Sequence, residues 1–288
     1  MAERPTSQPR VSLVVRTQGR RLRLLERALA SIRRQCEPSV EAIIVEDGSS
    51  EAGALVEAMN ANGSVMFREL PIAASGRCVA GNRGLEASRG EFVGFLDEDD
   101  ELLPDHVSRL AAALDATPGV DLVYARANEV VCGGLVSDEV REPETLPPGQ
   151  LVPFSRTALW RHNQFPIQAA LFRRSLFERE GGFDPAIQLL EDWDLWIRYS
   201  ACADFLAIDA VTSLFRSPRE PSLIEARVRE HRPWMDVLRL KHRDLIAPHR
   251  FEDVVQPPPP PPQTPTFRQA LGIGRRALAR KLGLGGKQ

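Results

Sequence analysis

The sequence has no long apolar run. None of its 288 residues lies in a stretch that approaches the roughly 20 consecutive apolar residues needed to span a bilayer. Residues 1–9 are polar and lack the apolar core of a secretory signal, so residues 1–10 are predicted to form a flexible tail. We therefore expect a cytoplasmic protein, or one that is peripheral to the inner face of the membrane.

Cysteine and histidine are scarce and scattered. The four cysteines, Cys36, Cys78, Cys132 and Cys202, form no Cys-x-x-Cys pair and are predicted to be free, mostly buried thiols in a reducing compartment. The five histidines do not cluster with them, which argues against a zinc site. The formal net charge is only -2, so no nucleic-acid partner is expected.

Strand-like and helix-like segments alternate through the first half of the chain. Strands are predicted at residues 11–15, 40–45, 64–68, 91–96 and 121–131, and helices at 22–34, 51–60, 76–88 and 104–116. This order predicts an α/β fold whose mainly parallel sheet is flanked by helices on both faces. Ligands of such sheets bind at the carboxyl ends of strands, where Asp47 and Asp97 fall.

The second half is less regular. Prolines mark a long connection over residues 141–159, and such loops commonly shape binding sites. Ordered structure is expected again at 167–172, followed by helices near Arg174 and at 191–200. A charged helical stretch at 222–243 is predicted to be broken by Pro233.

The last part of the chain has a biased composition. Residues 251–266 hold six consecutive prolines, which predicts a semi-rigid Pro-rich linker. Residues 267–288 carry six Lys and Arg but no acid, and their leucines can share one helical face. This basic amphipathic tail is expected either to contact an anionic membrane surface or to remain a solvated or partner-binding helix.

Four consecutive acids follow an apolar strand-like segment at 92–96. The carboxylates of Asp97, Glu98, Asp99 and Asp100 repel one another, and a divalent cation that bridges to a diphosphate would offset this repulsion. The alternative is a solvated acidic turn that precedes a helix N-terminus, where acids are favoured. The acids alone do not decide between the two.

Five motifs in order carry a family resemblance. They are a Thr17-containing turn at 14–20, Asp47-Gly48-Ser49 after an acid, a Gly81-Asn82 helix at 81–87, the acidic motif at 90–100, and Gly182-Phe183-Asp184 with Glu191-Asp192-Trp193. With them, residues 11–215 resemble the inverting family-two glycosyltransferases with the GT-A fold. The resemblance implies a Rossmann-like GT-A domain over residues 11–250 with a C-terminal helical extension.

The resemblance also implies a site for a nucleoside diphosphate-sugar. Asp47 would accept from the base or ribose, and Thr17 would line the nucleotide pocket. Asp97 would touch the ribose or the metal shell, and Asp99 would ligate Mg²⁺ or Mn²⁺. Arg77 would add positive charge near the diphosphate. The simpler alternatives are turn chemistry for Thr17 and Asp47 and an exposed helical side chain for Arg77.

Asp192 is the candidate general base, because displacement at the anomeric carbon requires a group that takes the proton of the acceptor hydroxyl. Glu191 and Trp193 are the candidate acceptor contacts. The alternatives are N-terminal helix capping for the acids and a core position for the tryptophan.

The chain departs from the family pattern at two places. Gly81 stands where Arg often precedes the Asn, and Phe215-Arg216 is not followed by the His that completes the metal shell, for which His231 is a weak stand-in. The transmembrane helices and Gln-x-x-Arg-Trp motif of the processive synthases are missing too. Single transfer from a nucleoside diphosphate-sugar to a glycan or lipid-linked acceptor is therefore expected.

Two other functions remain open. A nucleotide-sugar-binding scaffold with a decayed catalytic site would explain both departures. A nucleotidyltransferase is the weaker alternative, because residues 16–20 match a glycine-rich phosphate loop poorly.

Overall fold

The computed structural model describes residues 8–61, 65–132, 144–146, 151 and 153–246, all of which belong to one unit, Met1–Pro248. The predicted linker at 251–266 and basic tail at 267–288 lie outside the described residues, as do residues 1–7 of the predicted N-terminal tail.

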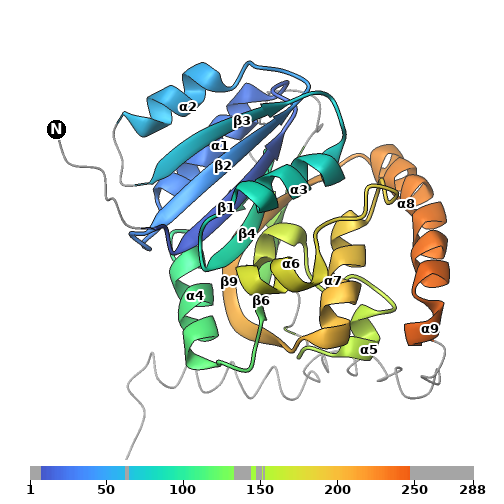
Figure 1. Ribbon diagram of the computed structural model, residues 1–288. Helices are drawn as coiled ribbons and strands as arrows, with labels where there is room; N and C mark the ends of the chain where they lie inside the picture. Colours follow the sequence, from blue (N-terminus) through green and yellow to red (C-terminus); the bar gives the residue numbers. More distant parts are fainter. Residues whose placement is uncertain (1–7, 62–64, 133–143, 147–150, 152, 247–288) are drawn as a thin grey trace, which may run out of the picture. The chain divides into compact units, whose positions relative to one another are not determined.

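A single twisted sheet forms the centre of this unit (Figure 1). Its strand order is β3-β2-β1-β4-β8-β6-β9-β5, and β7 pairs with β6. The strands are β1 (Val11–Thr17), β2 (Val40–Asp47), β3 (Met66–Ile72), β4 (Phe92–Asp97), β5 (Glu101–Leu102), β6 (Leu122–Cys132), β7 (Glu144–Leu146), β8 (Ala170–Arg173) and β9 (Phe205–Pro218). The first four long strands are parallel, as expected. Beyond β4 the sheet is mixed, because β8 runs antiparallel to both β4 and β6.

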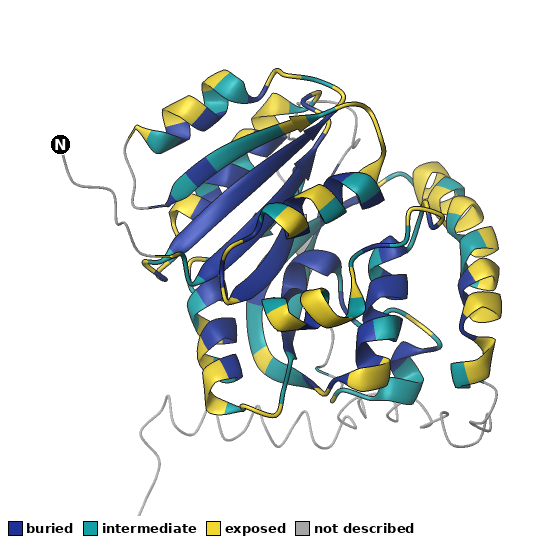
Figure 2. Ribbon diagram, in the orientation of Figure 1, coloured by how far each residue is buried: buried dark blue, intermediate teal, exposed yellow. Residues whose placement is uncertain are grey.

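Helices cover both faces of the sheet, which confirms the expected layers. They are α1 (Leu22–Arg33), α2 (Gly53–Asn60), α3 (Arg77–Ala87), α4 (His106–Ala116), α5 (Arg156–Leu159), α6 (Arg174–Glu180), α7 (Glu191–Cys202), α8 (Pro221–Lys241) and α9 (Arg243–Ile246), with a 3-10 turn at Ile167–Ala169. Side chains alternate along β1: Leu13 and Val15 join the cluster under α1, α2 and α4, whereas Val14 joins the one under α3 and α7. Figure 2 shows these central strands almost wholly buried.

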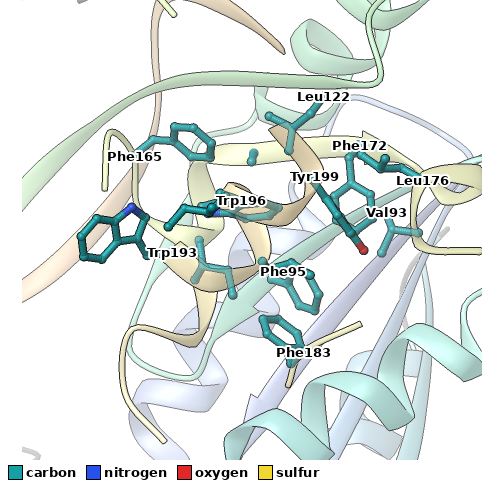
Figure 3. Close-up of a cluster of buried hydrophobic side chains, with 14 of the residues drawn as sticks. Val93, Phe95, Leu122, Phe165, Phe172, Leu176, Phe183, Trp193, Trp196 and Tyr199 are labelled. Atoms are coloured by element: carbon teal, nitrogen blue, oxygen red, sulfur yellow. The ribbon is translucent and has the colours of Figure 1, made fainter. Parts of the chain in front are cut away.

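The apolar cluster on the α7 side is rich in aromatic rings (Figure 3). Trp196 and Tyr199 from α7 are fully buried and pack edge-on against Phe172 of β8. Phe183, in the loop after α6, packs edge-on against Phe95 of β4 at a centroid distance of 5.1 Å. These contacts fix α7 and the loop before it against the sheet.

Two glycines allow α3 to approach its neighbours closely. A Cβ on Gly84 would lie 2.2 Å from the Val14 side chain, and one on Gly81 would lie 2.5 Å from the Phe183 ring. Asn82 then hydrogen-bonds the backbone N–H and C=O of Phe183 at 2.7 and 2.9 Å. Gly81, a departure from the family pattern, therefore has a packing reason, and two motifs distant in sequence lie together.

Helix α8 contradicts one expectation. Pro233 lies inside it, but the helix continues from Pro221 to Lys241. The contacts of Trp234, Met235 and Leu238 with the core offset the hydrogen bond that proline removes. Within the described ranges, no helix combines the length and apolarity that crossing a membrane requires.

The cysteines are free in the described structure, but only two of them are buried. Cys78 and Cys132 are buried, whereas Cys36 and Cys202 are exposed. The expectation that the thiols are mostly buried is therefore wrong for half of them.

Candidate functional site

The carboxyl ends of β2, β1 and β4 lie side by side because these strands are neighbours in the sheet. The parallel register pairs Thr17 with Glu46 and Arg16 with Asp97. Three of the predicted donor-binding residues, Thr17, Asp47 and Asp97, therefore meet at one edge. This is the edge where parallel α/β sheets bind ligands.

Arg16 is the central charge of the site. Its Nε and Nη2 atoms donate to the two carboxylate oxygens of Asp97 at 2.7 and 2.9 Å, and its Nη1 donates to Glu191 Oε1 at 3.0 Å. Burial lowers the pKa of Arg16, but the charges of Asp97 and Glu191 outweigh that effect and raise it. Burial likewise raises the pKa of Asp97, and Arg16 outweighs it, so the pKa of Asp97 is lowered. Arg16 thus joins β4 to the start of α7.

Arginines also compensate the rest of the acidic motif. Arg21 donates to Glu98 at 2.7 Å and to Asp99 at 3.0 Å. The side chains of Asp97 and Asp99 are 27% and 24% exposed, whereas that of Glu98 is only 8% exposed and accepts a hydrogen bond from Thr17 as well. The two predicted metal ligands are therefore more accessible than the acid between them.

Asp100 is the fourth acid of the motif and is buried. Its burial, together with the charges of Asp99 and Asp97, raises its pKa well above the ordinary value of an aspartate. The backbone N–H of Arg216 donates to its carboxylate at 3.3 Å. Arg216 is the arginine of the Phe215-Arg216 pair, after which the family pattern continues to a histidine that this chain lacks.

Asp47 and Thr17 shape the loops of the site. The Asp47 carboxylate accepts from the backbone N–H groups of Ser75 and Gly76 at 2.6 and 3.0 Å, which fixes the turn into α3. The Thr17 hydroxyl accepts from the N–H of Gly19 at 2.9 Å, and Thr17 as a whole is 4% exposed. Both side chains therefore hold the loops at this edge of the sheet, and their contacts with a donor stay predictions.

Arg77 and Glu191 face each other across the site. Arg77 begins α3, its side chain is half exposed, and its Nη1 lies 3.6 Å from Glu191 Oε1. Glu191 is buried and is shared by Arg77 and Arg16. Its position favours a role in placing these arginines over the predicted contact with an acceptor.

Asp192 has the environment of a proton acceptor. Its Oδ2 accepts from Asn163 Nδ2 at 2.9 Å and its Oδ1 accepts from the N–H of Trp193 at 2.7 Å. Burial, and secondarily the charge of Glu191, raises the pKa of Asp192 to about 6. A carboxylate with a pKa near neutrality is suited to general-base catalysis. Asn163 was not predicted from the sequence, because nothing in its local pattern marks it.

Trp193 lies in the core. It is 2% exposed, and its indole N–H donates to the carbonyl of Leu159 at 2.6 Å (Figure 3). The predicted stacking of Trp193 on an acceptor sugar is therefore corrected to a structural role. Helical spacing on α7 could not separate the two, because both place an aromatic ring on the inward face.

The metal-binding capacity of the site is limited. Among the described residues, no group of three or more His, Cys, Asp and Glu side chains is arranged to hold a metal ion. The pKa of His231 is lowered by burial and by Arg227, and the charges of Arg77 and Glu191 also act on it, so α8 brings this histidine near the site. Binding of a divalent cation by Asp97 and Asp99 stays a prediction.

Comparison with known proteins identifies the family. Residues 12–181 match the family described as Glycosyl transferase family 2. The chain is 29% identical over 193 residues to the putative colanic acid biosynthesis glycosyl transferase WcaA of Escherichia coli (strain K12), covering 66% of each chain. It is 28% identical over 223 residues to the succinoglycan biosynthesis protein ExoO of Rhizobium meliloti (strain 1021), covering 76% of this chain and 60% of that one.

A solved structure gives the same result for the fold. The S. aureus TarS 1-349 structure in complex with UDP-GlcNAc aligns with a TM-score of 0.56 at 20% identity, over 73% of this chain and 59% of that chain. This likeness confirms the expected GT-A fold. The chain spans about two thirds or less of the length of these three proteins. Since the family match covers more than half of the 288 residues, the chain belongs to glycosyl transferase family 2.

Proposed function

We propose that this chain transfers one sugar, with inversion, from a nucleoside diphosphate-sugar to a glycan or lipid-linked acceptor in polysaccharide biosynthesis. The observation that carries the proposal is the ion-paired link through Arg16, which holds donor-side Asp97 and the Asp192 end of α7 in one site. The names of WcaA and ExoO support the biosynthetic setting.

The reaction is a single displacement. Asp192 takes the proton of the acceptor hydroxyl, and the hydroxyl oxygen forms a bond to the anomeric carbon. The bond between that carbon and the phosphate oxygen breaks, and its electron pair leaves with the nucleoside diphosphate. Attack from the face opposite the leaving group inverts the anomeric configuration.

The donor side consists of Asp47, Thr17, Asp97 and Arg77. Arg77 stands at the N-terminus of α3, where both its own charge and the helix dipole favour a phosphate. UDP-GlcNAc is the first donor to test, because the TarS structure holds it and shares the fold.

A divalent cation fits the donor side. Mg²⁺ typically binds proteins through one or two carboxylates and completes its shell with substrate phosphates and water. Asp97 and Asp99 supply two such carboxylates, and bound Mg²⁺ or Mn²⁺ would neutralise the diphosphate as it departs. Arg21 already pairs with Asp99, so its side chain must shift when this ligand binds metal.

One observation favours the second candidate, a nucleotide-sugar-binding scaffold. The positive charges of Arg16 and Arg21 can compensate the acidic motif in place of a metal ion. The scaffold predicts that a donor raises the melting temperature while no acceptor supports turnover. The transferase predicts the same rise in melting temperature together with turnover on an acceptor.

The first prediction concerns Asp192. Asp192→Asn should lower kcat by about 10²- to 10⁴-fold, because the side chain keeps its shape and loses its proton affinity. In the wild type, kcat should fall below pH about 6, where Asp192 is protonated beside Glu191, Arg16 and Asn163. Transfer assays across pH test both, with Asp204→Asn, an exposed acid, as the control. Unchanged turnover of Asp192→Asn would remove the assignment of the base.

The second prediction concerns the metal. Chelation should abolish transfer, added Mg²⁺ or Mn²⁺ should restore it, and Asp99→Ala should raise the metal concentration required by at least about tenfold because a charged ligand is lost. Metal titrations of activity measure this, with the half-exposed Asp115→Ala as the matched control. If Asp99→Ala retains the wild-type metal dependence, Asp99 is not a ligand.

The third prediction concerns Arg16. Arg16→Met leaves the buried Glu191 without its closest cation and should destabilise the fold by about 3–5 kcal/mol in urea unfolding. Arg83→Met, which breaks an exposed pair with Glu86, should change stability by less than about 0.5 kcal/mol. Adding Glu191→Gln to Arg16→Met should restore part of the loss. Equal stability of Arg16→Met and Arg83→Met would show that Arg16 does not stabilise the buried Glu191.

The fourth prediction concerns the basic tail at 267–288, which we propose to bind anionic membrane surfaces where lipid-linked acceptors reside. The full chain should co-sediment with vesicles that contain phosphatidylglycerol and not with phosphatidylcholine vesicles. Replacing Arg275, Arg276, Arg280 and Lys281 by Glu should abolish this binding and leave transfer to a soluble acceptor unchanged. Vesicle binding that survives the charge reversal would refute the proposal.

A further inference from the structure

Asn163 lies beside the candidate base Asp192, and within the described part of the chain only the NH₂ group of its carboxamide forms a hydrogen bond. Its Nδ2 donates to Asp192 Oδ2 at 2.9 Å. Its Oδ1 is buried and accepts no hydrogen bond from any of the residues that the structure describes. The two ends of the amide cannot exchange, because an ionised carboxylate only accepts and must face the NH₂ group.

The segment that carries Asn163 is held against α7. The carbonyl of Leu159 accepts from the Trp193 indole at 2.6 Å, and Trp160 donates to Ser200 at 3.0 Å. Phe165 packs on Trp196 at a centroid distance of 5.5 Å. Contacts on both sides of Asn163 thus fix its position relative to Asp192, and an oxygen that is buried there without a hydrogen bond destabilises the site.

We infer that Asn163 Oδ1 accepts a hydrogen bond from a second hydroxyl of the acceptor, and that the acceptor is therefore a sugar with two adjacent free hydroxyls. The inference rests on the proposed transfer reaction. One hydroxyl loses its proton to Asp192 and attacks the donor, and its neighbour donates to Asn163.

The geometry of the amide supports an acceptor with two adjacent hydroxyls. Its oxygen and nitrogen are held about 2.3 Å apart by two bonds of fixed length. A hydroxyl bonded to Oδ1 and a hydroxyl bonded to Asp192 Oδ2 can therefore belong to neighbouring carbons of one sugar ring when both lie along the same edge of the amide. A deoxy or O-methyl group at the second position leaves Oδ1 unpaired in a desolvated complex, which disfavours transfer.

Gln164 provides the matched control. Its Oε1 is also buried without a partner, and it belongs to the same segment. Unlike Asn163, it makes no hydrogen bond to Asp192. Removing either carboxamide changes the segment similarly, but only Asn163 touches the base.

The test uses the full chain with UDP-GlcNAc, UDP-glucose and GDP-mannose as donors. The acceptors are p-nitrophenyl glucoside, galactoside and mannoside, together with their monodeoxy and mono-O-methyl derivatives. The pH–rate profile of each variant is measured first. Rates are then compared two pH units above the pH at which activity falls to half on the acid side, so that Asp192 is ionised throughout. This choice separates acceptor binding from the effect of Asn163 on the pKa of Asp192, which its hydrogen bond lowers.

For the wild type, we expect removal of the hydroxyl next to the attacked one to lower kcat/KM by about tenfold or more. Asn163→Ala should be slower with the parent glycoside and should show a deoxy-to-parent ratio near one. Gln164→Ala should retain the wild-type ratio. Asn163→Leu, which keeps the volume of the side chain and offers no oxygen, provides a second variant if Asn163→Ala unfolds, and the same ratio near one is expected for it.

Three results would overturn the inference. They are a deoxy penalty that persists in the Asn163 variants, a penalty abolished by Gln164→Ala instead, and donor hydrolysis without transfer to any of the glycosides. The last result would leave the donor side of the proposed function intact. If the chain neither hydrolyses any of the donors nor transfers a sugar from them, the proposed function itself is refuted.

Discussion

The site depends on one buried cation. Arg16 lies near the end of the central strand β1, between β2 and β4, where water cannot solvate its guanidinium. An unpaired charge in such a place costs several kcal/mol, so Asp97 and Glu191 must stay within bonding distance of it. The register of β4 against β1 and the placement of α7 therefore cannot vary independently, and the donor and acceptor sides are held together.

The sequence predicts the first half of the fold well because its central parallel strands form nearly continuous apolar runs. β1, β2 and β4 were all located within two residues. It missed β9, which is only partly buried and pairs with β6 across more than 70 residues, so no local pattern defines it. The proline rule failed at Pro233 because the tertiary contacts of α8 outweigh a local propensity.

The candidate acids of the site were visible in the sequence, but their partners were not. Arg16 bonds residues 81 and 175 positions away, and sequence spacing holds no information about such pairs. One feature of the sequence did indicate Arg16. It is a charged residue at the end of an apolar strand, directly after Val14 and Val15, and a charge buried there requires a partner of opposite charge. Asn163 had no comparable mark, since it lies in an irregular segment and bonds Asp192, which is 29 positions away in the sequence.

The structure moves the pKa values of two carboxylates in opposite directions, and this separation supports the roles proposed for them. Arg16 lowers the pKa of Asp97, which keeps it ionised for a cation or a ribose hydroxyl over the physiological range. Burial beside Glu191 raises the pKa of Asp192 to about 6, so it is mostly deprotonated at neutral pH yet retains proton affinity. Environments that separate acids in this way distinguish a charged ligand from a proton carrier. Arg16 thus lowers the pKa of Asp97 directly, and its second partner Glu191 adds to the effect of burial in raising the pKa of Asp192.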